Sequence, residues 1–190
     1  MNSIERIYEI LKEHSGNFEG TYYIPEKWNY SGFTGYAVSK ERPGEIRVDP
    51  YEFYKWNIKK YFLGREPQKS TASLSQSVIY SMMPRFCTAW PHGEDGKIQS
   101  GTFLKCMLLM PPLKQLGVNL IYLLPVFQYS SKYKKGSLGS VYSIRNIYRL
   151  DEGLHDPILD GADIRLEFKA FVEACHMLGM RVMLDFVFRT

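Results

Sequence analysis

One carboxylate lies in a strongly apolar segment near the end of the 190-residue sequence. Asp185 belongs to the segment 181–188, which otherwise consists mainly of Val, Met, Leu and Phe. A carboxylate is costly to bury unless it is hydrogen-bonded or paired with a cation. Parallel α/β proteins place their functional residues at the C-terminal ends of the strands. Asp185 is therefore a candidate site residue, and a structural role as a cap for a neighbouring loop fits the same spacing.

The segment 128–162 is the second candidate, because a loop this long inside a compact domain is usually functional or disordered. It carries Lys132, Lys134 and Lys135, followed by the run 136–143, which is rich in glycine and serine. A phosphate cradle needs a pattern such as Gly-x-x-x-x-Gly-Lys-Ser/Thr or Gly-x-Gly-x-x-Gly, and neither is present. The lysines fit a solvated surface better, and on this pattern alone packing is favoured for Tyr142.

The histidines and tryptophans show no catalytic pattern. His92 is expected to be exposed in a loop, His155 adjoins Asp156 but neighbouring residues rarely face each other, and His176 is expected to be structural. No Ser/His/Asp arrangement and no metal-ligand spacing is visible. Core packing is the expected role of the three tryptophans, which are Trp28, Trp56 and Trp90.

Short elements are expected in the first part of the chain. Apolar residues at helical spacing predict a helix over residues 4–11. The aromatic stretch 22–30 contains a proline and predicts irregular structure or short strands. Asp49 and Pro50 predict the start of a second helix, with Glu52 reaching back as in a capping box. The segment 64–76 is a predicted connector.

From residue 77 the sequence predicts alternating strands and helices. The expected strands are 78–83, 118–124 and 181–188. One expected helix covers 102–116 and must be broken or kinked by its two prolines, and another starts after Asp163. Strands that are apolar on both faces and separated by helices indicate a parallel sheet covered on each side. A doubly wound sheet and a (β/α)8 barrel both fit. A barrel needs ~250 residues, so the sequence is expected to be the front of a longer protein.

Composition mainly excludes classes of partner. The chain has 24 Lys and Arg against 20 Asp and Glu, mixed along the sequence, which supports neither nucleic acid nor a polybasic membrane contact. No apolar run approaches the ~20 residues of a membrane span, and the N-terminus does not open a signal peptide. The scattered cysteines (Cys87, Cys106 and Cys175) fit reduced core residues, so a cytoplasmic location is expected.

Three ordered segments resemble one family. The segment 117–126 (GVNLIYLLPV) resembles the second barrel strand of the α-amylase superfamily of glycoside hydrolases and transglycosylases. The segment 140–148 (SVYSIRNIY) is similar to its Gly-Tyr-Asp loop, and 168–187 resembles its second helix running into its first conserved strand motif. Within the superfamily, the bacterial 4-α-glucan maltosyltransferases are most similar; the segments that carry this are 101–105, 134–136, 154–157 and 185–190, with a weak likeness at 48–52.

The resemblance implies a fold and a division of the chain. Residues 76–190 would form the first three strands of an incomplete (β/α)8 TIM barrel within the α/β class. Residues 1–75 would form an aromatic-rich α+β segment ahead of it. An isolated piece of this kind would expose strand edges and an apolar face, so we expect aggregation, with the strand 181–188 at a sheet edge.

Two departures from the amylase pattern bear on function. The amylase motif Asp-x-x-x-Asn-His keeps Asp185, but Arg189 and Thr190 replace Asn and His. Because that Asn commonly helps to bind a structural calcium ion, no cofactor is expected and calcium is doubtful. Ser143 stands where the family has the Asp of Gly-Tyr-Asp, while Tyr142 is retained. These changes argue against an ordinary α-amylase and are compatible with the maltosyltransferases.

The resemblance also implies roles for single residues. Tyr142 would stack on the glucose next to the scissile bond, and Ser143, Arg189 and Thr190 would contact substrate around the pocket. Asp185 would support the nucleophile. The family's mechanism is retaining, through a glycosyl-enzyme. Its nucleophile, its acid/base and its third carboxylate are expected beyond residue 190, so this segment alone is expected to be inactive.

Three functions follow as hypotheses. The leading one is the N-terminal part of an α-glucan-active transglycosylase that transfers maltosyl units between 1,4-α-glucans. The alternatives are a hydrolase of the same superfamily and a non-catalytic, amylase-like binding or scaffold protein. The expected partners are α-1,4-glucan oligosaccharides, with a homodimer of the full-length protein left open, and neither nucleic acid nor membrane.

Overall fold

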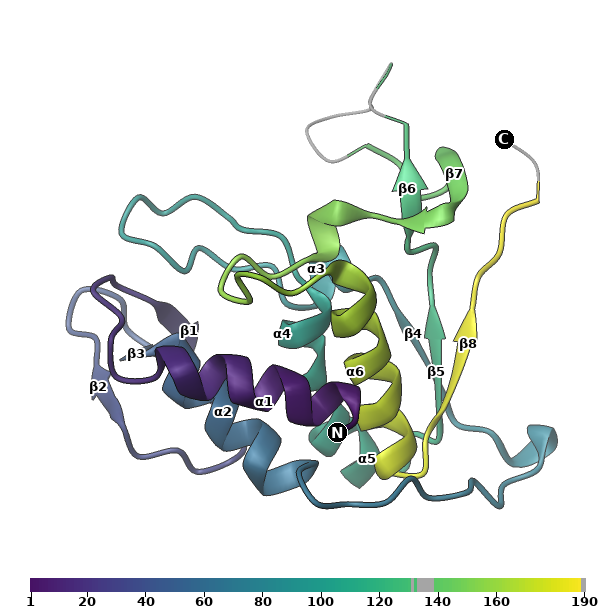
Figure 1. The fold of residues 1–190 in the computed structure, drawn as a ribbon, viewed down its shortest axis with the longest axis horizontal. Coiled ribbons are helices and arrows are strands. Elements are labelled where there is room, and N and C mark those ends of the chain that lie inside the picture. Colours follow the sequence, from purple (N-terminus) through teal and green to yellow (C-terminus); the bar gives the residue numbers. More distant parts are fainter. Residues whose placement is uncertain (131, 133–138, 189–190) are drawn as a thin grey trace.

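The computed structural model describes residues 1–130, 132 and 139–188, and it shows a mixed α/β fold with small sheets (Figure 1). Two of the lysines singled out above, Lys134 and Lys135, and the pair Arg189 and Thr190 lie outside these described residues. The helices are α1 (Ser3–His14), α2 (Pro50–Tyr61), α3 (Pro84–Cys87), α4 (Phe103–Met107), α5 (Met110–Gln115) and α6 (Ile164–Met177). The strands are β1 (Tyr23–Pro25), β2 (Tyr36–Val38), β3 (Glu45–Val48), β4 (Ile79–Met82), β5 (Leu120–Leu123), β6 (Phe127–Tyr129), β7 (Ile144–Leu150) and β8 (Arg181–Leu184).

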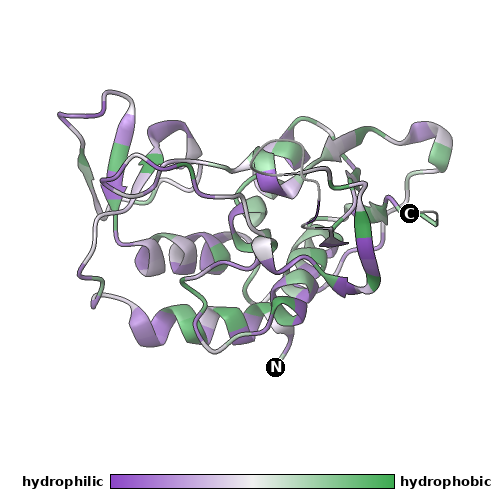
Figure 2. Cartoon of the chain, turned by 90° about the horizontal axis from the view of Figure 1, so that it is seen from above, coloured by the Kyte–Doolittle hydropathy of each residue, from purple (hydrophilic) through white to green (hydrophobic). Residues whose placement is uncertain are grey.

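The first part of the chain contains α1, α2 and a small antiparallel sheet. Both predicted helices are confirmed, and α1 buries its apolar stripe while its other face is polar (Figure 2). At the start of α2 the Asp49 carboxylate accepts hydrogen bonds from the amides of Tyr51 and Glu52, as a helix cap should. The predicted capping box is wrong, because the Glu52 carboxylate pairs with Lys55 at 2.8 Å. The aromatic stretch contributes β1, which pairs with β3 in the order β1-β3-β2.

A parallel sheet in the order β4-β5-β8 forms the centre of the second part. All three predicted strands are confirmed with shorter bounds, and Leu120 pairs with Ile79 on one side and Arg181 on the other. Asp185 was predicted inside the third strand, but β8 ends one residue earlier. The Asp185 amide still donates to the Leu123 carbonyl over 2.8 Å, so its backbone continues the ladder by one bond.

The helices around this sheet follow from local signals. The predicted helix 102–116 is two short helices, α4 and α5, and Pro111 lies in the first turn of α5, where a missing N–H costs nothing. The helix after Asp163 is confirmed, since the Asp163 carboxylate accepts from the Leu166 amide over 2.9 Å. Its buried face carries Phe171, whose ring centroid lies 5.9 Å from that of Phe103 on α4.

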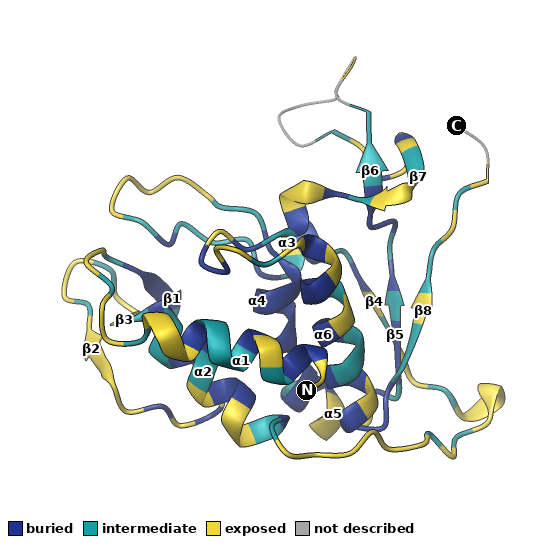
Figure 3. Cartoon of the chain, in the orientation of Figure 1, coloured by how far each residue is buried: buried dark blue, intermediate teal, exposed yellow. Residues whose placement is uncertain are grey.

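In the part of the chain that the structure describes, helices cover only one face of the parallel sheet. Met82, Ile121 and Leu123 are buried on the face that contacts α4 and α6, whereas the other face leaves Ile79 54% and Met183 43% exposed (Figure 3). The prediction of a sheet covered on each side is therefore wrong for the described residues. The strand expected at a sheet edge, β8, is at the edge.

The open face predicts self-association that one surface substitution should reduce. Met183→Lys is expected to raise the monomeric fraction of the 190-residue chain. The Met183 side chain is 43% exposed, so a lysine there can reach solvent and would place a charge in the apolar face. Leu123→Lys is the contrast, since this fully buried position cannot accept an unpaired charge and the chain should unfold. Size-exclusion chromatography and far-UV circular dichroism measure both outcomes. A wild-type chain that is already monomeric and unfolds cooperatively would contradict the prediction.

The segment 128–162 is more ordered than a loop. β6 and β7 pair antiparallel, with Phe127 opposite Leu150 and Tyr129 opposite Ile144, and the register shifts twice between these pairs. Figure 1 shows both strands beyond the C-terminal ends of β4 and β5. The prediction of an irregular segment is therefore wrong for β7 and for the start of the region. The hairpin places residues 139–143 on the side of the sheet where parallel α/β proteins carry their sites.

Candidate functional site at the strand ends

One hydrogen bond brings together two of the predicted site residues. The Tyr142 hydroxyl donates to Asp185 Oδ2 over 2.8 Å, between residues that are 43 positions apart in the sequence. Asp185 directly follows β8, and Tyr142 lies in the connection between β6 and β7. Asp185 is half-buried, and the Tyr142 side chain is 47% exposed. The Tyr142 side chain is therefore almost half exposed while its hydroxyl donates to the carboxylate.

A second tyrosine, which the sequence analysis did not single out, lies near the same carboxylate. Tyr122 lies on β5, next to β8 in the sheet and opposite Met183. Hydrogen bonding to Asp185 raises the pKa of Tyr122 and that of Tyr142 above the ordinary value for tyrosine. The sequence did contain a signal for this residue, because Tyr122 is the one aromatic hydroxyl in the apolar segment 118–124. Asp185 therefore accepts a hydrogen bond from Tyr142, and a second phenol lies near it on the neighbouring strand.

Ser143 contributes through its backbone to the turn that holds Tyr142. Its carbonyl accepts from the Ser130 amide over 2.7 Å, and its amide donates to the Ser140 carbonyl over 3.1 Å. The Ser140 hydroxyl accepts from the Tyr142 amide over 3.2 Å. The Ser143 side chain, next to Tyr142 in the sequence, is exposed. Lys132 is also exposed, as expected for a solvated lysine.

A buried ion pair connects the residue after β7 to the short helix α3 that follows β4. Arg85 on α3 donates from Nε to Asp151 Oδ2 over 2.9 Å, and its Nη2 contacts the same oxygen. The guanidinium also lies 3.8 Å from the centroid of the Tyr129 ring on β6. The two charged side chains are only 5% and 8% exposed. Arg85 therefore joins three segments at the strand ends, and no pattern in the sequence signalled this.

A second buried network joins two of the segments that carried the maltosyltransferase resemblance. The Glu167 carboxylate on α6 accepts from the amides of Leu104 (2.8 Å) and Asp156 (3.0 Å). It also lies 2.9 Å from Nδ1 of His155, and this hydrogen bond raises the pKa of His155. Asp156 accepts from the Thr102 hydroxyl over 2.6 Å. His155 thus pairs with Glu167 and not with its neighbour in sequence, and the network is structural.

Sequence comparison agrees with the resemblance. No family model matches the chain. The α-1,4-glucan:maltose-1-phosphate maltosyltransferase of Mycolicibacterium smegmatis is 30% identical over 116 residues, which cover 56% of this chain and 16% of the relative. The intracellular maltogenic amylase of Bacillus subtilis strain 168 is 37% identical over 76 residues, or 40% of this chain and 10% of the relative. The chain is a homologue of α-amylase superfamily enzymes. It spans 16% of the length of the first of these relatives.

Among solved structures, an α-amylase from Lactobacillus plantarum is similar to this superfamily homologue. It has 29% sequence identity and a TM-score of 0.44, over 57% of this chain and 22% of the other.

His92 has a different environment from the one expected. The sequence predicted an exposed side chain, but in the structure His92 is fully buried. Its Nδ1 lies 2.8 Å from the Tyr23 carbonyl, and its ring stacks on Tyr22 with centroids 4.2 Å apart. Burial lowers the pKa of His92 to about 3. His92 is therefore a neutral packing residue, which its local sequence gave no reason to expect.

His176 and the tryptophans vary in burial. His176 lies on α6 and is exposed. Trp28 and Trp90 are half-buried, with ring centroids 5.9 Å apart, as packing predicts. Trp56 is 41% exposed, so the packing prediction is only partly met there. The three cysteines are free, and two of them are buried.

The burial of His92 predicts acid sensitivity. Its pKa is about 3 in the folded chain against an ordinary 6.5, so below pH 6.5 the unfolded chain binds a proton that the folded chain does not. Stability is therefore present above pH 6.5 and is lost as the pH falls toward 3. His92→Phe keeps a ring to stack on Tyr22 and cannot titrate, so urea midpoints measured at pH 7.5 and pH 5 should differ less than in the wild type. An equal difference in both proteins would contradict this.

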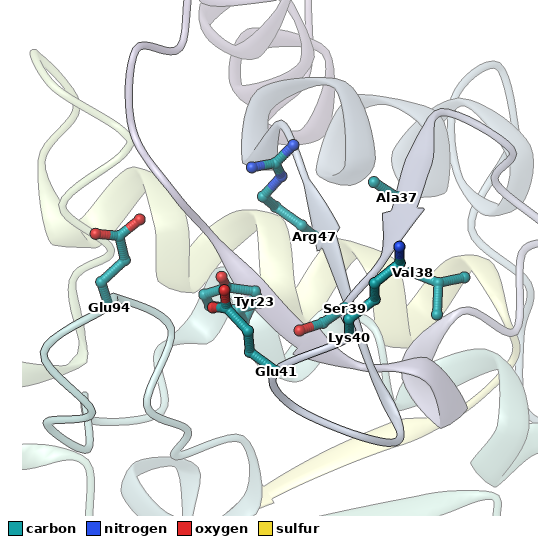
Figure 4. A pocket seen from close by; sticks show the side chains of 8 residues that line it. All are labelled: Tyr23, Ala37, Val38, Ser39, Lys40, Glu41, Arg47 and Glu94. Carbon is teal, nitrogen blue, oxygen red and sulfur yellow. The ribbon is translucent and has the colours of Figure 1, made fainter.

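The pocket drawn in Figure 4 lies away from Asp185. It has a volume of about 290 Å³ and is lined by Tyr23, Val38 and Arg47 of the N-terminal sheet and by Glu94 from a separate loop. In the described part of the chain, no three His, Cys, Asp or Glu side chains form a group that could hold a metal ion. No described helix is both long and apolar enough to cross a bilayer.

Proposed function

We propose that this chain supplies the first three strands of a (β/α)8 TIM barrel, β4, β5 and β8, in an α-glucan-active retaining transglycosylase. Residues 76–190 would be this partial barrel, and residues 1–75 the segment ahead of it. The enzyme would transfer maltosyl units to 1,4-α-glucans. Support comes from the relative named α-1,4-glucan:maltose-1-phosphate maltosyltransferase and from the segments whose sequence resembles that group.

The observation that carries the proposal is the hydrogen bond between Tyr142 and Asp185 at the C-terminal side of the parallel strands. Under the proposal the exposed ring face of Tyr142 stacks on the glucose next to the scissile bond. Its hydroxyl holds Asp185 in the orientation that supports the nucleophile. Ser143, Arg189 and Thr190 contact the sugar around this point.

The proposed reaction needs two carboxylates that we place outside these 190 residues. One attacks C1 of the donor and forms a glycosyl-enzyme, while the other protonates the leaving oxygen. The second carboxylate then takes a proton from the acceptor hydroxyl, which attacks C1 and releases the first. The residues of this chain position the sugar and the nucleophile. The isolated chain would therefore be inactive, and the mechanism requires no metal ion.

Product analysis of the whole protein tests the proposal. With maltose 1-phosphate as donor and maltotetraose as acceptor, maltosyl transfer gives inorganic phosphate and products longer than maltotetraose by two glucose units. A hydrolase, which the maltogenic amylase relative favours, gives only glucose and shorter maltooligosaccharides. The absence of any product would favour a non-catalytic binding protein and overturn the proposal.

A further inference from the structure

A pocket between α1 and α6 gathers positive charge. It has a volume of about 440 Å³ and is lined by Arg6 of α1 and by Arg165 and Lys169 of α6. All three side chains are exposed. Of the described residues that line it, Asp163 is the one acid, and its Oδ1 accepts from the Leu166 amide over 2.9 Å. The pocket therefore has a surplus of positive charge that is independent of the strand-end site.

The acids that could neutralise these cations within their own helices are engaged elsewhere. Glu173, one turn after Lys169 on α6, accepts from the Ser3 hydroxyl (2.8 Å) and the Ile4 amide (3.0 Å). Glu9, three residues after Arg6 on α1, pairs with Lys12 at 3.0 Å. Within the described chain, none of the three cations forms an ion pair with a carboxylate.

Among the exposed helical cations of the described chain, Lys59 and Lys114 likewise form no ion pair, so this pocket is distinguished by three cations from two helices lining it together. Lys12 and Lys55 also lie on exposed or half-buried helix faces, and each pairs with a glutamate three residues before it. Arg165 and Lys169, in contrast, are like charges four residues apart, a spacing that destabilises a helix. Charges that repel each other and lack partners are stabilised when an anion binds between them.

We propose that this pocket binds a phosphate monoester of small size. Two guanidinium groups and an ammonium group from two helices suit a compact dianion, because the planar guanidinium can donate two parallel hydrogen bonds to phosphate oxygens. The volume of about 440 Å³ fits a small ligand, and the mixed charge of the rest of the chain does not favour a long polyanion. The proposal does not depend on the function proposed above.

Titration of the 190-residue chain, carrying Met183→Lys to keep it monomeric, with inorganic phosphate, glucose 1-phosphate and glucose tests this site. Isothermal calorimetry should detect binding of the phosphates, weakened by added NaCl, and no binding of glucose. The double variant Arg6→Gln/Arg165→Gln should bind at least tenfold more weakly. Arg149→Gln, which changes an exposed arginine on β7, is the matched control and should bind as the wild type does.

The outcomes separate the sources of the phosphate and decide the proposal. Equal affinity for both phosphates means that the pocket recognises the phosphate group alone, and tighter binding of glucose 1-phosphate means that it also contacts the sugar. No binding of either, or an equal loss in Arg149→Gln and in the double variant, would overturn the site. Phosphate should also protect Arg6 and Arg165 of the wild type, and not Arg149, from phenylglyoxal, a readout that does not depend on the folding of a variant.

Discussion

Substituting Asp151 with alanine is expected to lower the free energy of unfolding by about 3–5 kcal/mol. The carboxylate is the partner of Arg85, and the two side chains are only 5% and 8% exposed. Without Asp151 the guanidinium remains buried next to Tyr129 and loses its ion pair with this carboxylate. Urea denaturation followed by circular dichroism measures the change. A loss below about 1 kcal/mol would show that solvent reaches the pair, as it does in surface pairs.

Two further variants test whether the loss of stability comes from the buried charge of Arg85. Arg85→Met combined with Asp151→Leu removes both charges and should recover more than half of the stability lost in Asp151→Ala, because two apolar side chains cost no desolvation of charge. Lys12→Ala breaks an exposed pair with Glu9 and should leave the urea midpoint unchanged. Hydrogen exchange in Asp151→Ala should rise first in β6 and β7, since Asp151 also donates its amide to the Val126 carbonyl over 2.9 Å.

Local interactions were the part of the fold that the sequence could predict. Asp49 and Asp163 cap their helices through amides two or three residues later, so the necessary residues are adjacent in the sequence. Pro111 could likewise be recognised as incompatible with a continuous helix. The break falls before it, at the start of α5, because a proline fits the first turn of a new helix better than the end of an old one.

Contacts between distant segments were not predictable in the same way. His92 is buried by Tyr22 and Tyr23, about seventy positions earlier, and its local Trp-Pro-His-Gly sequence resembles an exposed turn. β7 was not recognised as a strand because its face toward solvent carries polar and exposed residues, so it lacks the continuous apolar run of β5. The family resemblance placed Tyr142 and Asp185 in one pocket, but the hydrogen bond between them was not predicted.

The largest effect on activity is expected from Asp185→Asn in the whole protein. If Asp185 supports the nucleophile, the amide removes a charge and an acceptor at this point, and kcat for maltosyl transfer should fall about 10²–10⁴-fold. The fold should be little affected, because Asp185 is half-buried and its backbone amide still donates to Leu123. Steady-state release of phosphate from maltose 1-phosphate, together with the thermal midpoint, measures both quantities.

Two substitutions of Tyr142 test the hydroxyl and the ring of this side chain separately. Tyr142→Phe removes the donor to Asp185 and keeps the ring, so kcat should fall by about 10–100-fold, the worth of a hydrogen bond to a charged group. Tyr142→Ala also removes the ring and should raise KM in addition, because the stacking surface for the sugar is lost. Tyr148→Phe, at a tyrosine that is 87% exposed on β7, should change neither. If Asp185→Asn and Tyr142→Phe instead lower the thermal midpoint and leave kcat unchanged, the contact only fastens the hairpin to β8 and the strand-end site is not catalytic.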